Sequence, residues 1–155
     1  YWVGHAYARL MTRLGNPARA AWKDSEKPGS RASERHKLLT HDKARYEDEP
    51  GWWVLRPELK MGPASWGWVE RAIASIRGLE RPGALEAIDT PILIVATTAD
   101  QLVDTNRIIT DAERLPNAEL VLYGDEAAHE LLREADTVRN QVVATMNRFL
   151  ERLTR

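Results

Sequence analysis

The stretch TPILIVATTADQLVD, residues 90–104, decides the fold of this chain. Its centre, ILIVA at 92–96, is a continuous apolar run rich in β-branched residues, without alternation between apolar and polar positions. Such a run predicts a strand that is buried on both faces of a parallel sheet. Polar residues follow directly, so the strand is expected to end shortly before Asp100.

The segments after this strand alternate between helix and strand patterns. Residues 104–115 predict a helix that Pro116-Asn117 ends, and AELVLY at 118–123 predicts a second strand. A last helix is expected with Asp136 as its N-cap. Its apolar stripe consists of Val138, Val142, Met146, Phe149, Leu150 and Leu153. This order predicts a βαβ crossover with a closing helix. Two such strands alone make a poor sheet, so part of the sheet is expected outside these residues.

The first 80 residues are expected to be mostly helical. Helical spacing relates Tyr7, Leu10, Met11 and Leu14, and again Trp66, Val69, Ile73 and Ile76. Between them, the charged segment 24–50 with its Pro28-Gly29 breaker predicts a solvated connection, in which Thr40 caps a short helix, and 51–63 is expected to be irregular. We therefore expect a helical cap over 1–80 and a βαβα core over 81–155, which opens with a short helix at 84–88.

The composition is that of a globular domain with one modest core. The chain has 155 residues, is 43% hydrophobic and 29% charged, and carries a net charge of −1. Its 22 basic and 23 acidic residues are interspersed, which argues against a nucleic-acid groove. The absence of cysteine excludes disulfides and thiolate metal sites. Because the chain opens on a helical pattern without methionine, we expect it to be a piece of a longer protein.

Two side chains that can carry chemistry follow the two predicted strands. Asp100 follows the first strand, and His129, in GDEAAHELL at 124–132, follows the second. Ligands of open α/β sheets gather at the carboxyl ends of the strands, and adjacent parallel strands bring their tips together. An aspartate beside a histidine fixes the imidazole tautomer that a general base needs. The two residues together predict a catalytic pair, although singly Asp100 fits a turn or cap and His129 fits an ordinary loop.

Other acidic and histidine residues are weaker candidates. Asp104 is the nearest rival to Asp100, but its position favours a helix cap. Asp125 and Glu126 precede His129 too closely to reach its far ring nitrogen. The remaining histidines, expected at the surface, are His5, His36 and His41. No spacing suggests zinc and no glycine-rich loop suggests a nucleotide, so neither a metal nor a cofactor is expected.

The segments TPILIVATTADQLVD and LPNAELVLYGDEAAHELLRE resemble the C-terminal part of α/β-hydrolases of the lysophospholipase and monoacylglycerol lipase group. Asp100 and His129 fall on the positions of the triad aspartate and histidine. LLTHDKARYE at 38–47 and MGPASWGWVERAIASI at 61–76 are similar to the cap of bacterial lysophospholipase-like members. The resemblance implies a partial α/β-hydrolase fold, with a helical cap, the last two parallel strands and their helices, and without the N-terminal half of the sheet.

The nucleophile of that family is the feature that this sequence lacks. The family carries its serine in Gly-x-Ser-x-Gly, a strand-to-helix elbow, and no such pentapeptide is present. The serines are Ser25, Ser30, Ser33, Ser65 and Ser75. Ser65, in GPASWG, has the second glycine but proline in place of the first, and the strained elbow needs both. The resemblance therefore implies a triad whose serine lies outside this chain.

The tryptophans allow two interpretations. All of them lie in the first 68 residues: Trp2, Trp22, Trp52, Trp53, Trp66 and Trp68. They can simply fill a small, irregular cap. Alternatively Trp66 and Trp68 form an apolar wall or membrane-facing rim for an acyl chain, which suits amphipathic indoles. Only one face of their helix can point inward, so the two cannot play the same part. Trp66, Trp68 and Val103 are our candidate substrate-binding residues.

The function expected from these features is ester hydrolysis of lysophospholipids or monoacylglycerols, with this chain inactive on its own because it lacks the serine. The expected partners are a lipid ester, the N-terminal half that carries the serine, and a second copy bound through an exposed sheet edge. The expected location is the cytoplasm, including the membrane periphery. The alternative is a catalytically silent lipid-binding or interaction module of the same fold.

Overall fold

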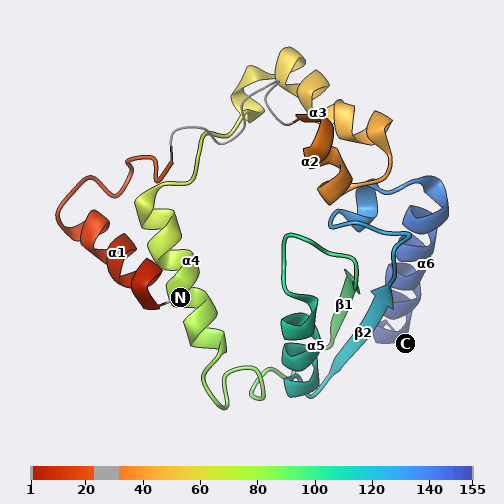
Figure 1. Cartoon of the computed structure of the whole chain (residues 1–155). Helices are drawn as coiled ribbons and strands as arrows, with labels where there is room; N and C mark the ends of the chain where they lie inside the picture. The colour runs from red at the N-terminus through yellow and green to blue at the C-terminus, as the bar shows by residue number, and fades with distance from the viewer. Residues whose placement is uncertain (1, 23–31, 155) are drawn as a thin grey trace.

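The two predicted strands pair in parallel at the centre of the C-terminal part. The structure is a computed structural model that describes residues 2–22 and 32–154. β1 (Ile92–Thr97) lies beside β2 (Ala118–Tyr123), in a register that runs from Ile92 opposite Ala118 to Thr97 opposite Tyr123. α5 (Thr105–Arg114) connects the strands, and α6 (Asp136–Leu153) follows them. The two helices lie on either side of the strands, as a βαβ crossover with a closing helix requires (Figure 1).

The core of this part lies between β2, the loop after it and α6. Tyr123, Ala127, Val138 and Val142 form the buried cluster, and Val95, Val121 and Leu131 pack against it. The expected burial of β1 on both faces is wrong for most of the strand, since only Ala96 and Thr97 are buried. The described residues form two strands, so each strand has a neighbour on one side only. The first four residues of β1 are therefore only partly buried. The predicted self-association through a free edge stays a prediction.

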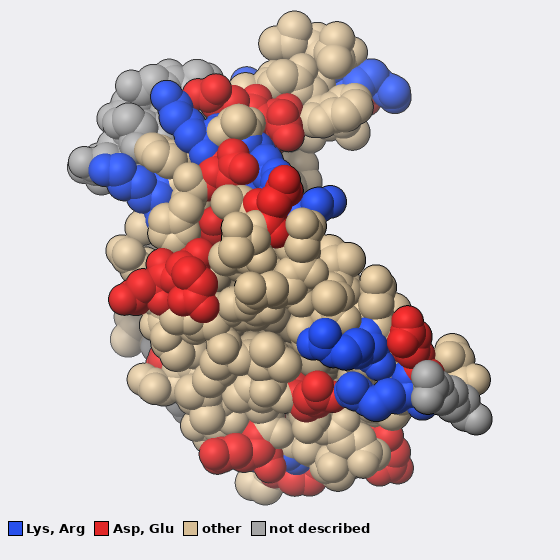
Figure 2. All heavy atoms as spheres, turned by 90° about the vertical axis from the view of Figure 1, so that its right-hand side faces the viewer, with Lys and Arg blue, Asp and Glu red and all other residues tan. Residues whose placement is uncertain are grey.

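The C-terminal part of α6 is also exposed on its apolar side. Its predicted apolar stripe is buried at Val138 and Val142, whereas Met146, Leu150 and Leu153 are exposed. The molecular face that carries this helix has a central area without Lys, Arg, Asp or Glu (Figure 2). No helix in residues 2–22 and 32–154 combines the length and the apolarity that crossing a membrane requires.

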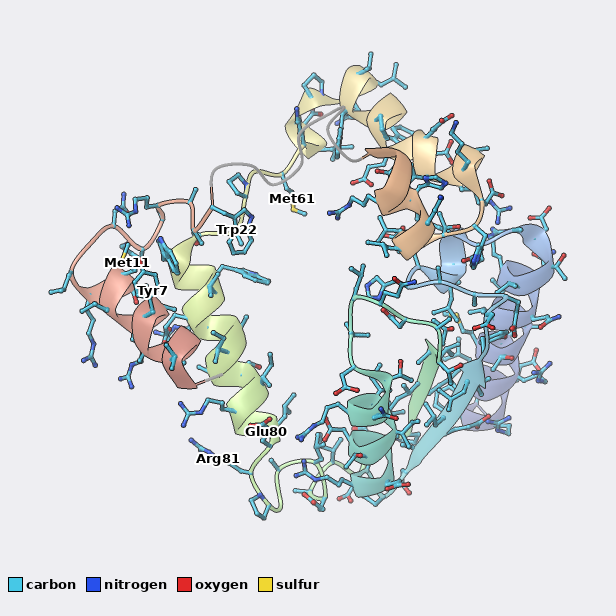
Figure 3. The ribbon with its side chains drawn as sticks, in the orientation of Figure 1. Tyr7, Met11, Trp22, Met61, Glu80 and Arg81 are labelled. Atoms are coloured by element: carbon cyan, nitrogen blue, oxygen red, sulfur yellow. The ribbon has the colours of Figure 1, made fainter. Side chains whose placement is uncertain are left out.

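The first and fourth helices form a pair. α1 (Trp2–Arg13) packs against α4 (Trp66–Leu79), with the ring of Tyr7 edge-on to that of Trp66 at 5.1 Å (Figure 3). The predicted helices are confirmed. Of the apolar stripe predicted for the first helix, Tyr7 contacts α4 and Met11 is half-buried, whereas Leu10 and Leu14 are exposed. Ala8, which was not part of the stripe, is fully buried.

His5 is also buried in this pair, which corrects its expected surface position. Its Nδ1 accepts a hydrogen bond of 2.8 Å from Arg77, because a guanidinium can only donate. Its Nε2 lies 3.5 Å from a carboxylate oxygen of Glu70. Arg77 therefore satisfies Nδ1 of the buried histidine, whereas Nε2 makes no hydrogen bond to the described residues.

α2 (Ala32–Leu39) and α3 (Lys43–Leu55) form the second helical unit, followed by the single turn η1 (Pro57–Leu59). The cap predicted at Thr40 is wrong: Asp42 caps α3 by accepting from the backbone N–H of Arg45. Thr40 is fully buried and donates its hydroxyl to the carbonyl of Arg133, 2.7 Å away. The breaker expected at Pro28-Gly29 lies outside the described residues.

The expected irregularity of 51–63 is wrong up to Leu55, because α3 continues through Pro50. A proline in a helix leaves the carbonyl four residues earlier without its backbone donor. Here that carbonyl belongs to Tyr46, and the guanidinium of Arg133 donates to it at 3.1 Å. A side chain from the C-terminal part thus supplies the hydrogen bond that Pro50 cannot.

The segment between α4 and β1 is a turn and not the predicted short helix at 84–88. Gly83 adopts a φ of +83°, in the left-handed region that favours glycine and interrupts a helix. The predicted N-cap of α6 is also displaced. Ala135 holds that position, and Asp136 is the first helical residue, where it accepts a hydrogen bond from Arg45.

Arg114, at the end of α5, joins α4 to the βαβ unit. Its guanidinium donates to the carbonyls of Leu79 at 3.1 Å and Arg81 at 2.8 Å, and to Glu86 at 2.9 Å. The hydrogen bond from Arg114 lowers the pKa of Glu86 to about 2. Glu80 and Arg81 mark this junction at the end of α4 (Figure 3). The boundary at residue 80 between the helical cap and the βαβα core stays a prediction.

Candidate active site

Asp100 and His129 are in direct contact. Asp100 follows the end of β1 and His129 follows the end of β2, so parallel pairing brings both to one edge of the sheet. The distance from His129 Nδ1 to Asp100 Oδ2 is 2.8 Å, which is a hydrogen bond. The Asp100 side chain is 5% exposed and the His129 side chain 35% exposed. A buried carboxylate therefore holds a histidine that solvent can reach.

The carboxylate of Asp100 is fixed from its other side by the backbone of its own turn. Its Oδ1 accepts from the N–H groups of Leu102 at 2.8 Å and Val103 at 3.1 Å. Burial raises the pKa of Asp100, but the hydrogen bonds from His129, Leu102 and Val103 outweigh it, and the net pKa is lowered. Asp100 is therefore held as a carboxylate that accepts three hydrogen bonds.

This arrangement orients the imidazole. An ionised carboxylate only accepts, so His129 presents N–H at Nδ1, and neutral imidazole then carries a lone pair at Nε2. No hydrogen bond joins Nε2 to any residue in the described ranges 2–22 and 32–154. A histidine held in this tautomer can take a proton at Nε2 from a hydroxyl, while the aspartate stabilises the resulting imidazolium.

Thr97, the last residue of β1, ties the two halves of the site together. Its hydroxyl is fully buried, within 2.9 Å of the Gly124 carbonyl and 2.8 Å of the Ala127 carbonyl, and it accepts from the N–H of Ala99 at 3.0 Å. The strand that precedes Asp100 is thereby bonded to the loop that carries His129. Thr97 was not predicted as part of the site, because a threonine at the end of a strand has no distinguishing local pattern.

Replacing Thr97 by valine is expected to destabilise the chain by about 1–3 kcal/mol. Valine keeps the shape but leaves the buried carbonyl of Ala127 and the N–H of Ala99 without the hydroxyl. Urea unfolding measures the change, with Thr90→Val as the control, because Thr90 is exposed and a surface substitution costs about 0.5 kcal/mol or less. Equal stability of the two variants would contradict this role for Thr97.

The pKa of Asp100 is expected to rise when His129 is replaced by phenylalanine. Phenylalanine keeps the carboxylate covered but removes a hydrogen bond that lowers the pKa. Since the folded pKa of Asp100 lies below its unfolded value, Asp100 stabilises the fold above the unfolded pKa, and this stabilisation is lost as pH falls through the folded pKa. The His129→Phe variant should therefore lose part of the stabilisation that ionised Asp100 gives the fold.

Carboxyl carbon NMR titration measures the Asp100 pKa directly. His36→Phe is the matched control, because His36 lies on α2 against Tyr46, at a ring distance of 5.9 Å, and not on Asp100. An Asp100 titration that is the same in both variants would rule out the described hydrogen bond as a determinant of its pKa.

The predicted substrate residues are only partly brought to this pair. Val103 lies beside Asp100 and is 44% exposed. Trp66 is half-buried against Tyr7, and Trp68 is 62% exposed. Both tryptophans are on α4, which lies beside α1 and apart from the carboxyl ends of the strands (Figure 1). The structure therefore places Val103 at the site and the two tryptophans elsewhere.

The rival residues have other partners. Ser65 caps α4, the helix that lies apart from the strand ends (Figure 1), by accepting from the N–H of Trp68 at 3.1 Å. Asp104 caps α5 as predicted, accepting from the N–H of Asn106 at 3.0 Å. Asp125 and Glu126 are exposed in the loop before His129. Ser25 and Ser30 lie outside the described residues. Within 2–22 and 32–154, no three His, Cys, Asp or Glu side chains are grouped to hold a metal.

Two known proteins are similar to this chain. Over 96 residues, 61% of this chain, the sequence is 32% identical to a probable lysophospholipase L2 of Haemophilus influenzae, of which the match covers 29%. A crystal structure of a soluble monoglyceride lipase variant from Saccharomyces cerevisiae, in complex with a substrate analogue, matches with a TM-score of 0.70 at 19% identity. That match covers 96% of this chain and 46% of the lipase chain. No family model matches.

The chain thus spans less than half the length of both proteins. Its helices and two-stranded parallel sheet confirm the predicted fold class. The chain has a partial α/β-hydrolase fold and is related to the lysophospholipase and monoacylglycerol lipase-like hydrolases.

Proposed function

We propose that this chain supplies the aspartate and histidine of a serine ester hydrolase. The observation that carries the proposal is the hydrogen bond of 2.8 Å between Asp100 and His129 at the carboxyl ends of adjacent parallel strands. The relationship to lipase-type hydrolases supports it, because a buried aspartate on the histidine is the arrangement that activates a serine. The serine comes from residues outside these 155, in the same polypeptide or in another chain.

In the proposed reaction, Nε2 of His129 takes the proton of the serine hydroxyl while the serine oxygen attacks the ester carbonyl. The resulting tetrahedral intermediate collapses, and the protonated Nε2 gives its proton to the departing alcohol. Water then repeats the sequence on the acyl-serine, with His129 as base and then as acid, and releases the fatty acid. Asp100 stays ionised throughout and stabilises the imidazolium of His129.

The proposed substrates are lysophospholipids or monoacylglycerol-type esters. The names of the related proteins support this choice: one is called a lysophospholipase, and the other is a monoglyceride lipase with a bound substrate analogue. Val103, exposed beside Asp100, is proposed to contact the substrate. Exposed Trp68 is proposed to contact an acyl chain or a lipid surface, because an indole suits an apolar boundary with water.

The test uses the complete protein that contains these residues. We expect hydrolysis of a monoacylglycerol, a lysophospholipid or a short p-nitrophenyl ester. The assay measures the release of the fatty acid or of nitrophenol. The ratio of kcat/KM for the two lipids then identifies the substrate class. A complete protein that binds such lipids but hydrolyses none of the three esters would replace this proposal by the silent lipid-binding module.

A further inference from the structure

Glu134 is a fully buried carboxylate close to His129 in the chain, and the proposed reaction does not use it. It follows the single helical turn η2 (Leu131–Arg133), and its side chain is 1% exposed. Burying a carboxylate is costly unless hydrogen bonds satisfy it. A residue of this type at a buried position therefore indicates a specific set of donors.

The donors to Glu134 come from two segments, one nearby in the sequence and one 93 residues away. One carboxylate oxygen accepts from the N–H of Ala128, the residue before His129, at 2.7 Å. The carboxylate also accepts from the N–H of His41 at 3.1 Å, and His41 Nδ1 lies 3.0 Å away. An ionised carboxylate has enough acceptor positions for all three donors. Glu134 therefore joins the loop of His129 to the segment between α2 and α3.

Backbone hydrogen bonds also join the loop of His129 to the last turn of α2. The N–H of His129 donates to the carbonyl of Leu38 at 3.3 Å, and that of Glu130 donates to Leu39 at 2.7 Å. His129 thus lies in a peptide stretch that is fixed at its own N–H and at both neighbouring N–H groups. Of these three N–H groups, only that of Ala128 donates to a side chain, the carboxylate of Glu134. A substitution of Glu134 can therefore remove one of the three hydrogen bonds that hold this stretch.

We propose that Glu134 is a positioning residue that holds the backbone of Ala128, and so places His129 against Asp100. Through His41, it also makes that placement depend on the segment between α2 and α3. A catalytic group must stay within about 0.5 Å of its productive geometry. The Ala128 N–H belongs to the peptide unit just before the one that carries the His129 N–H, so a shift of the Ala128 N–H moves the following residue and its imidazole relative to Asp100. The catalytic consequence rests on the proposed function, but the geometric one does not.

Glu134→Gln is the variant that tests this role. Glutamine keeps one oxygen for Ala128, but it presents an amide NH₂ where the carboxylate accepted from His41, so two donors face one another. Asp125→Asn is the matched control, because it removes one carboxylate from the same loop at an exposed position. Both variants are made in the complete protein, and urea unfolding checks that they are folded.

Two measurements are made on each variant. We expect Glu134→Gln to raise the pKa of Asp100 towards its value in His129→Phe, and to lower kcat by about 10- to 100-fold with little change in KM. Asp125→Asn should leave both unchanged. A folded Glu134→Gln protein whose Asp100 titration and kcat match the parent overturns the proposal.

His41→Ala keeps the test decisive if Glu134→Gln does not fold. This imidazole is half-exposed, so its removal is tolerable, and the backbone N–H of His41 is kept. We expect a smaller rise in the Asp100 pKa, and no rise overturns the proposal. If the parent protein hydrolyses no ester, the proposed function fails, but the Asp100 titration still decides whether Glu134 positions His129.

Discussion

Replacing His129 by alanine is expected to lower kcat of the complete enzyme by about 10⁴- to 10⁶-fold. Alanine removes the base that takes the serine proton and the acid that delivers it to the leaving alcohol. Binding of the lipid is not expected to change comparably, because the imidazole acts mainly on the transition state. The measurement is steady-state hydrolysis of the preferred lipid ester.

The control for this variant is His36→Ala. His36 lies on α2 and packs against Tyr46, so its removal takes away an imidazole without touching Asp100. We expect kcat within a few-fold of the parent. A His129→Ala enzyme that retains more than about one hundredth of the parental kcat would show that another group acts as the base.

Replacing Asp100 by asparagine is expected to lower kcat by about 10⁴-fold. The asparagine amide can turn its NH₂ towards Nδ1 of His129, which favours the tautomer with the proton on Nε2. That nitrogen can then no longer accept the serine proton. Overall geometry should be kept, because asparagine has nearly the shape of aspartate and its oxygen can still accept from Leu102 and Val103.

Asp104→Asn is the matched control for Asp100→Asn. Asp104 caps α5, and asparagine is about as good an N-cap as aspartate, so stability and kcat should both be close to the parent. The two aspartates lie in the same segment after β1, and the same substitution tests each of them. Equal losses of activity in the two variants would mean that Asp100 is not the orienting carboxylate.

The arrangement of the C-terminal part followed from local patterns. ILIVA and AELVLY are short apolar runs bounded by polar residues, and a helix pattern separates them, which suffices for a parallel pair with a crossover. The contact between Asp100 and His129 followed from the same rule, because parallel strands end at one edge of the sheet. Asp104 was predicted as a cap because a cap is a local feature.

Features that depend on distant contacts could not be predicted. Thr40 has the sequence pattern of a helix cap, yet its hydroxyl bonds to Arg133, 93 residues away in the sequence. Pro50 should interrupt a helix, but the same arginine supplies the missing donor. In the sequence, Glu134 resembles any charged loop residue; only the fold brings His41 to the carboxylate that also accepts from Ala128. His5 is buried against α4, where Arg77 donates to its Nδ1 and Glu70 lies 3.5 Å from its Nε2. The sequence of its own helix does not show these contacts.

The most direct test of the central claim is to find which serine the complete protein activates. A fluorophosphonate probe labels a serine only where a nearby base has activated it, and mass spectrometry of the peptides identifies that residue. We predict one labelled serine outside these 155 residues, in a Gly-x-Ser-x-Gly sequence, and loss of the label in His129→Ala and Asp100→Asn. Labelling that persists in both variants, or that falls on Ser65, would contradict the account.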